Sequence, residues 1–226
     1  MRLNTLNTDI INNIYDYVIF EPKNKDELQV AVDLWYEDKE KAINYYGHIS
    51  LWNTSLITDM SNLFENKTDF NDNINNWNVS SVTDMCFMFA NASLFNQPLN
   101  SWNVSSVTSM KDMFEGASFF NQPLNSWNVS SVINMACMFN GASSFNHPLD
   151  SWDVSSVTHM VFMFNRASSF NQSLNSWKRT ALDNRPPDNY FSQNRYFSIF
   201  FNDNMYKMFE GASSFNRDNA LWYKFS

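Results

Sequence analysis

Several residue types are scarce in this chain of 226 residues. Only two cysteines are present, Cys86 and Cys137, which is too few for a disulfide scaffold, so we predict two free, partly buried thiols. Lysine and arginine total 15 against 23 aspartates and glutamates, which gives a net charge of −8. This balance argues against binding to nucleic-acid phosphates and against docking on anionic membranes. We therefore expect no nucleic-acid partner.

The sequence also lacks a run of 18 apolar residues, so we expect no membrane insertion. Asn and Asp interrupt the apolar positions of the first 20 residues, and we predict no secretory signal there. Both absences favour an intracellular protein. The sequence contains no phosphate-binding glycine loop, no plausible nucleophile–base pair and no metal-ligand cluster. We expect neither enzymatic activity nor a cofactor.

What the chain has instead is a repeat of 25 residues. An apolar skeleton that returns at this interval, between variable polar positions, is typical of a solenoid. The interval is broken once, because Met163 and Met208 are 45 residues apart, and we place the extra material at 178–204. The clearest markers of the period are Trp52, Trp77, Trp102, Trp127, Trp152 and Trp177.

The pattern within one unit predicts a strand followed by a helix. In "LNSWNVSSV", Trp102 and Val104 alternate with polar residues, as on the buried face of a strand. In "SSVTSMKDMFEGA", apolar residues recur at three- and four-residue steps, as on one side of a helix that ends near Gly116. The expected fold class is an α/β repeat solenoid of leucine-rich-repeat-like strand-and-helix coils. One unit buries too little to offset the ordering of its residues, so neighbours must stack.

The N-terminal part predicts a helical cap over the first coil. Asn24 followed by Glu27 is typical of a helix start, and the helix that follows has one apolar side. A second short helix is expected from Lys39 to Tyr46, ending at Gly47. We divide the chain into an N-terminal helix (1–23), a helical cap (24–51) and the repeats (52–226) with their insertion. The apolar side of the first cap helix consists of Leu28, Ala31, Val32 and Trp35.

The repeat "FNQPLNSWNVSSVTxMxxMFxGAxx" resembles the BspA-like leucine-rich repeat family, in the 25-residue version first catalogued in mycoplasma surface proteins of unknown function. The resemblance covers about Lys25 to Trp177 and resumes at Met205. It implies a right-handed strand-and-helix solenoid on a cell surface that binds proteins or adheres. It implies no catalytic residues. This location conflicts with the intracellular one that the missing leader favours.

A shorter resemblance lies at the start of the chain. "LNTDIINNIYDYV" is similar to the first helix of an F-box, with Asn7 where proline is usual. Such a helix implies a substrate adaptor for ubiquitin ligation. An amphipathic capping helix explains the same apolar residues. The matching positions are Leu6, Asp9, Ile10, Ile14, Tyr17 and Val18.

Two groups of residues are candidates for binding a partner. Asn103, Asn128 and Asp153 follow the repeated tryptophan, so we expect them to point away from the core and to line the concave face. A uniform Asn/Ser surface is either a structural ladder or a regular lattice, for instance for glycans. The second group is aromatic and basic and lies in the insertion: Tyr190, Phe191, Arg195, Tyr196 and Phe197.

These observations favour a non-enzymatic monomer that mediates protein–protein interaction. An F-box-like adaptor and a surface array that binds glycans are the alternatives.

Overall fold

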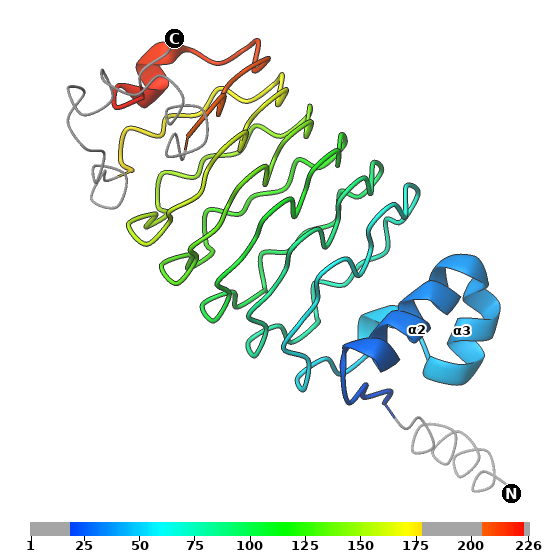
Figure 1. The fold of residues 1–226 in the computed structure, drawn as a ribbon. Coiled ribbons are helices and arrows are strands. Elements are labelled where there is room, and N and C mark those ends of the chain that lie inside the picture. Colours follow the sequence, from blue (N-terminus) through cyan, green and yellow to red (C-terminus); the bar gives the residue numbers. More distant parts are fainter. Residues whose placement is uncertain (1–18, 178–204, 224–226) are drawn as a thin grey trace, which may run out of the picture.

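The computed structural model describes residues 19–177 and 205–223. Helices α2 (Lys25–Glu37) and α3 (Lys39–Tyr46) lie at one end of a stack of coils (Figure 1). Each coil takes one 25-residue unit, and successive coils lie side by side along the stack (Figure 1). The 3₁₀-helix η1 (Ile49–Leu51) leads into the first coil, and η3 (Arg217–Ala220) lies in the last. No helix in the described ranges is long and apolar enough to cross a membrane.

The two predicted cap helices are confirmed. The Asn24 side chain accepts a hydrogen bond from the Glu27 amide at 3.0 Å, as a helix N-cap should. The chain leaves α3 at Gly47, whose positive φ of 68° suits glycine. The apolar side of α2 is buried as expected, through Leu28, Ala31, Val32 and Trp35.

The predicted fold class is wrong for the repeats. Between residues 52 and 177 the structure contains turns and isolated parallel bridges, but no α-helix and no strand. The bridges join Asp59 to Asp84 and continue coil by coil to His159. The stack is therefore not the α/β arrangement of strand-and-helix coils that the apolar spacing predicted.

The segment expected as a helix does not form one, because its amides bond to two different coils. The amides of Asp112 and Phe114 donate to the next coil, to Ala136 and Met138, both at 2.9 Å. The intervening Glu115 amide donates back to the Asp112 carbonyl at 3.1 Å. An α-helix needs every amide for its own i−4 carbonyl. Apolar residues at three- and four-residue steps fit such successive turns as well as they fit a helix.

Left-handed residues also exclude a helix here. Asp112 and Gly116 have φ values of 56° and 65°, outside the right-handed region. Asn91 and Arg166, in the same position of other coils, are left-handed too, with φ values of 58° and 57°.

The segment expected as a strand is interrupted by turns on both sides of the tryptophan. The Trp102 amide donates to the Leu99 carbonyl at 3.1 Å, and the Val107 amide donates to the Val104 carbonyl at 3.0 Å. Both bonds close three-residue steps that an extended strand cannot contain. The inward direction of Trp102 and Val104 is nevertheless confirmed, because they are 4% and 1% exposed.

Stacked aromatic rings form the core. Within one coil, Phe114 and Phe120 lie 4.0 Å apart between ring centroids. Each ring also stacks on its equivalent in the next coil, Phe114 on Phe139 at 5.7 Å and Phe120 on Phe145 at 6.0 Å. The same two columns run through the whole described stack. Neighbouring coils thus bury each other's rings, which is the stacking that the repeat requires.

The repeated indoles bridge coils as well. Trp127 is 3% exposed, and its Nε1 donates to the Leu99 carbonyl of the preceding coil at 3.0 Å. The bond satisfies a buried donor and a buried acceptor together. Trp77 makes the equivalent bond to Ile49 of η1, and the same bond to the preceding coil recurs at Trp102, Trp152, Trp177 and Trp222.

The stack of coils continues across the 45-residue interval that interrupts the repeat. Phe164 stacks on Phe209 at 5.7 Å, and Trp177 stacks on Trp222 at 6.1 Å, both across 45 residues. This confirms that the repeat frame resumes after the insertion. The insertion itself (178–204), with its candidate aromatic residues, and the F-box-like segment lie outside the described residues.

Candidate interaction face

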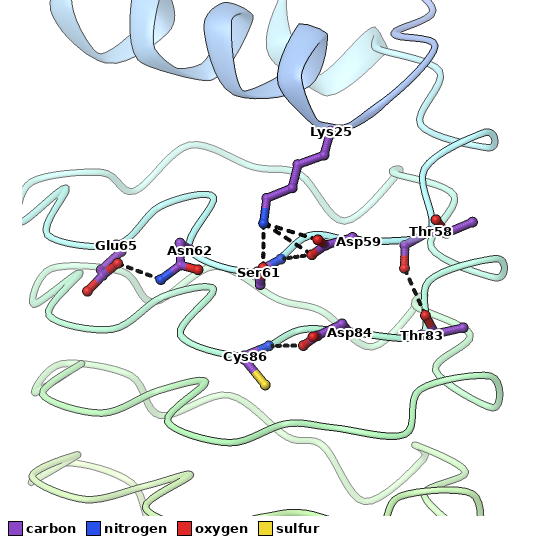
Figure 2. A network of polar contacts seen from close by, with 9 residues as sticks. All are labelled: Lys25, Thr58, Asp59, Ser61, Asn62, Glu65, Thr83, Asp84 and Cys86. Carbon is purple, nitrogen blue, oxygen red and sulfur yellow. Dashed lines mark hydrogen bonds and ion pairs between the residues drawn. The ribbon is translucent and has the colours of Figure 1, made fainter.

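The side chains of four positions in each coil lie on one side of the stack, which we call the turn face. Figure 2 looks onto the part nearest α2 and shows Asp59, Ser61, Asn62 and Glu65 along one coil, with Asp84 and Cys86 on the next. Positions repeat every 25 residues and are numbered here by the first coil. Position 59 holds Asp59, Asp84, Ser109, Asn134 and His159. Position 61 holds Ser61, Cys86, Lys111, Ala136, Val161 and Tyr206. Position 62 holds Asn62, Phe87, Asp112, Cys137, Phe162 and Lys207. Position 65 holds Glu65, Ala90, Glu115, Asn140, Asn165 and Glu210.

The side chains of the turn face differ in chemical type from coil to coil, whereas those of the core are nearly the same in every coil. Position 61 alone offers a hydroxyl, a thiol, an ammonium, a methyl, an isopropyl and a phenol group. Most of these side chains are half-buried or exposed. The face therefore presents a different combination of groups at each coil on a nearly constant backbone.

The end of the turn face nearest α2 binds an ammonium group from the cap. Lys25 on α2 reaches Asp59, with its Nζ 3.2 Å from both carboxylate oxygens, and it also contacts the Ser61 hydroxyl (Figure 2). Partial burial opposes the charge of Asp59. Hydrogen bonds from Ser61 and Lys25 outweigh burial and hold the pKa of Asp59 below its usual value. Asp59 is thus a charged acceptor for a cation.

The next coil repeats this arrangement without a cation. Asp84 accepts a hydrogen bond from the Cys86 amide at 2.8 Å, as Asp59 does from the Ser61 amide at 2.8 Å (Figure 2). In the described part of the chain no lysine or arginine contacts Asp84. Burial, together with the Asp84 carboxylate, raises the pKa of the Cys86 thiol to about 11. This thiol is a poor nucleophile at neutral pH, since the thiolate is the reactive form.

The middle of the turn face carries a small charged cluster. The Lys111 ammonium lies 4.8 Å from the centroid of the Phe87 ring and 3.2 Å from an oxygen of Asp112, which is 4% exposed. Burial, with the nearby Asp112, raises the pKa of Glu115. Burial and Asp112 also raise the pKa of the Cys137 thiol to about 12. Cys86 and Cys137 are both free and half-buried, as predicted.

The predicted asparagine candidates lie elsewhere and are confirmed as exposed. Their side-chain oxygens close local turns: Asn103 and Asn128 accept from the amides of Ser105 and Ser130, both at 3.2 Å. Asp153 accepts from the Ser155 amide at 3.0 Å. These bonds give the row a structural role, because they close a turn in each coil. The Nδ2 groups of Asn103 and Asn128 have no protein acceptor within the described ranges.

A parallel row links neighbouring coils. Asn125 accepts from the Ser151 amide at 3.1 Å and donates to Asp150 at 3.2 Å. Asn75 makes the equivalent bond to the Ser101 amide at 3.1 Å. The residues of this row therefore act as a ladder between coils.

A metal centre finds no support among the described residues, which contain no group of three or more His, Cys, Asp or Glu side chains that could hold an ion.

Sequence reasoning did not find the turn face, because it assigned these positions to helices. A signal was nevertheless present, since these four neighbouring positions vary between repeats whose apolar core positions are almost constant. Partner surfaces usually show such variation, with aromatic residues among them.

A family model described as "Mycoplasma protein of unknown function, DUF285" matches residues 35–136, 102–200 and 191–225. No curated protein and no solved structure matches the chain significantly. The family match concerns neither leucine-rich repeats nor an F-box helix, so both resemblances stay predictions. Since the three matches together run from residue 35 to residue 225, the chain belongs to this DUF285 family of mycoplasma proteins of unknown function.

Proposed function

We propose that the protein is a non-enzymatic repeat protein that binds another protein through the turn face. The observation that carries the proposal is that four neighbouring positions on one face change from coil to coil, on a core that hardly changes. A surface that only stabilised the stack would be expected to repeat as the core does. Variable side chains on a rigid scaffold are how repeat proteins commonly form extended binding surfaces.

The aromatic residues of the turn face support this proposal. Tyr206 is 49% exposed, and its ring packs edge-on against Phe162, with centroids 5.5 Å apart. Phe87 is half-buried with the Lys111 ammonium over its ring. Aromatic residues beside charged ones often contribute most of the energy of protein interfaces.

The test uses substitutions that the repeat itself contains. Phe87→Asn with Lys111→Ser places at these positions the residues of the first coil, Asn62 and Ser61, so the stack should fold normally. Affinity capture of the full chain should lose its specific protein partner with this double variant.

A matched control changes another surface in the same way. His147→Gln with Asp150→Asn restores the residues found in other coils at positions outside the turn face. Capture should be unchanged by these two substitutions. Equal capture by the wild type and both double variants would contradict the proposal.

The regular row of Asn78, Asn103 and Asn128 supports glycan binding as a second candidate. Its three Nδ2 donors recur at one position of successive coils and have no acceptor within the described residues. Glycan-array binding that persists after deletion of 178–204, and that is lost with Asn103→Ala and Asn128→Ala together, would favour this alternative. It would count against the turn face as the binding surface.

A further inference from the structure

We propose that the turn face takes an extended basic segment of its partner, and that a lysine or arginine of that segment pairs with Asp84 as Lys25 pairs with Asp59. The inference rests on the proposed function and specifies the chemistry of the partner. Four features carry it: an ammonium bound to this face by the chain itself, an equivalent carboxylate without a cation, the acidic charge of the turn face, and an aromatic ring beside that carboxylate.

The chain supplies its own example of the interaction. Lys25 comes from α2, outside the coils, and its ammonium lies on Asp59 and Ser61 of the turn face (Figure 2). The Asp59 carboxylate is fixed by the Ser61 amide at 2.8 Å, so it is oriented for the cation in advance. Position 59 with the following turn is thus an acceptor for a lysine that arrives from outside the coil.

Asp84 is the same acceptor one coil further along. A parallel bridge pairs it with Asp59, and its carboxylate is fixed by the Cys86 amide as Asp59 is by the Ser61 amide. No cation of the described residues contacts it, and it is half-buried at the surface. A partner lysine at Asp84 would lie beside Lys25 in the same row.

Charge complementarity favours a basic partner. Between residues 52 and 177 the four turn-face positions hold five acidic residues and one basic residue, Lys111. Lys111 pairs with Asp112 at 3.2 Å and Lys25 pairs with Asp59 at 3.2 Å. Among the described residues no cation pairs with the other three acids of this face, Glu65, Asp84 and Glu115. An acidic surface attracts basic partners and orients them as they approach.

An aromatic ring lies next along the same coil. Phe87 follows Asp84 by three residues and holds the Lys111 ammonium 4.8 Å from its ring centroid. A cation over an aromatic face is a favourable contact in proteins. The turn face thus holds two ammonium groups of the chain itself, Lys25 on the carboxylate at position 59 and Lys111 on the ring at position 62.

The experiment is zero-length carbodiimide coupling of an octa-lysine peptide to the full chain, with the linked carboxylates located by mass spectrometry. Carbodiimide links a carboxylate to an amine without a spacer, and coupling is fastest where the two groups are already paired, so the Lys25–Asp59 pair provides an internal positive control. Asp150 is more exposed than Asp84 and lies outside the turn face. We expect about two- to fivefold more coupling at Asp84 than at Asp150, the ratio that corresponds to a surface ion pair.

Two variants make the outcome specific. Asp84→Asn should abolish coupling at position 84 without harm to the fold, because Asn134 makes the same bond at its own coil, to the Ala136 amide at 3.0 Å. Asn134→Asp should create a new coupling site. Coupling that follows exposure, with Asp150 equal to Asp84 or above it, would overturn the inference, as would the absence of coupling at the new carboxylate of the Asn134→Asp variant.

The failure of this inference can be told apart from failure of the proposed function. Suppose that the captured protein no longer binds the Phe87→Asn and Lys111→Ser double variant but binds Asp84→Asn as it binds the wild type. The turn face then stays the binding surface, and the inference of a basic segment at Asp84 is overturned. A partner protein that binds neither the double variant nor Asp84→Asn would support both proposals.

Discussion

Replacing Trp127 by alanine tests the physical basis of the stack. The indole is 3% exposed, it stacks on Trp102 at 6.4 Å, and it supplies the donor for the Leu99 carbonyl of the preceding coil. Removing it leaves a cavity between coils and a buried carbonyl without its partner. We expect Trp127→Ala to lower the free energy of unfolding by about 3–5 kcal/mol, the usual cost of removing a large buried aromatic side chain.

Two further substitutions separate the contributions. Trp127→Phe keeps an aromatic ring but loses the N–H, so it should cost less, about 1–3 kcal/mol for an unsatisfied buried acceptor. Asn128→Ala removes an exposed side chain whose oxygen accepts hydrogen bonds from the Ser130 amide and hydroxyl, and it should cost about 0.5–1.5 kcal/mol. The neighbouring position thus provides a control in the same coil.

The assay is urea unfolding of each purified variant, followed by far-ultraviolet circular dichroism, with the slope m compared between variants. A loss below about 1 kcal/mol for Trp127→Ala, or equal losses for Trp127→Ala and Asn128→Ala, would refute the assignment of the indoles as the link between coils.

Other consequences are open to measurement. Gly116→Ala should destabilise the fold more than Gly141→Ala: both have positive φ, but a methyl at Gly116 would lie 2.5 Å from the Asn91 side-chain oxygen, whereas nothing lies closer than 3.6 Å at Gly141. Thermal unfolding should rank the two variants in that order, and a reversal would contradict the packing. The pKa values of Cys86 and Cys137 are raised to about 11 and 12, so in the folded chain both thiols should react with iodoacetamide at pH 8 more slowly than the thiol of a cysteine peptide. In urea, where the chain is unfolded, both should react as fast as the peptide. Fast labelling of the folded chain would show that the thiolates form readily.

The cap illustrates what local sequence signals can predict. Asn24 and Glu27 mark a helix start through a contact within one turn, and the apolar side of α2 follows from its own spacing. These signals involve neighbours in the chain, so they can be read without knowing the fold. The contacts that fix the cap on the first coil are different: Trp35 donates to Asp72 at 2.8 Å, across 37 residues.

The coils illustrate where local reasoning fails. Met110 and Phe114 are four residues apart, which fits a helix, and both are buried as a helix would require. Their amides instead donate to Asn134 and Met138 of the next coil, both at 2.9 Å. Whether an amide bonds along its own segment or to a neighbouring coil depends on where that neighbour lies. The spacing of apolar residues contains no information on this choice.

The sequence alone determined the period, the inward tryptophans, the break and its resumption, and the cap helices, because each depends on which residues recur or lie close in the chain. Only the tertiary structure decided that the coils consist of turns, since inter-coil hydrogen bonds occupy amides that a helix would need. It also decided that Asp59 and Asp84 lie side by side on one face, with Lys25 on the first and no cation of the described residues on the second. Residues from distant parts of the sequence meet there, because the coils stack on one another and α2 lies at the end of the stack.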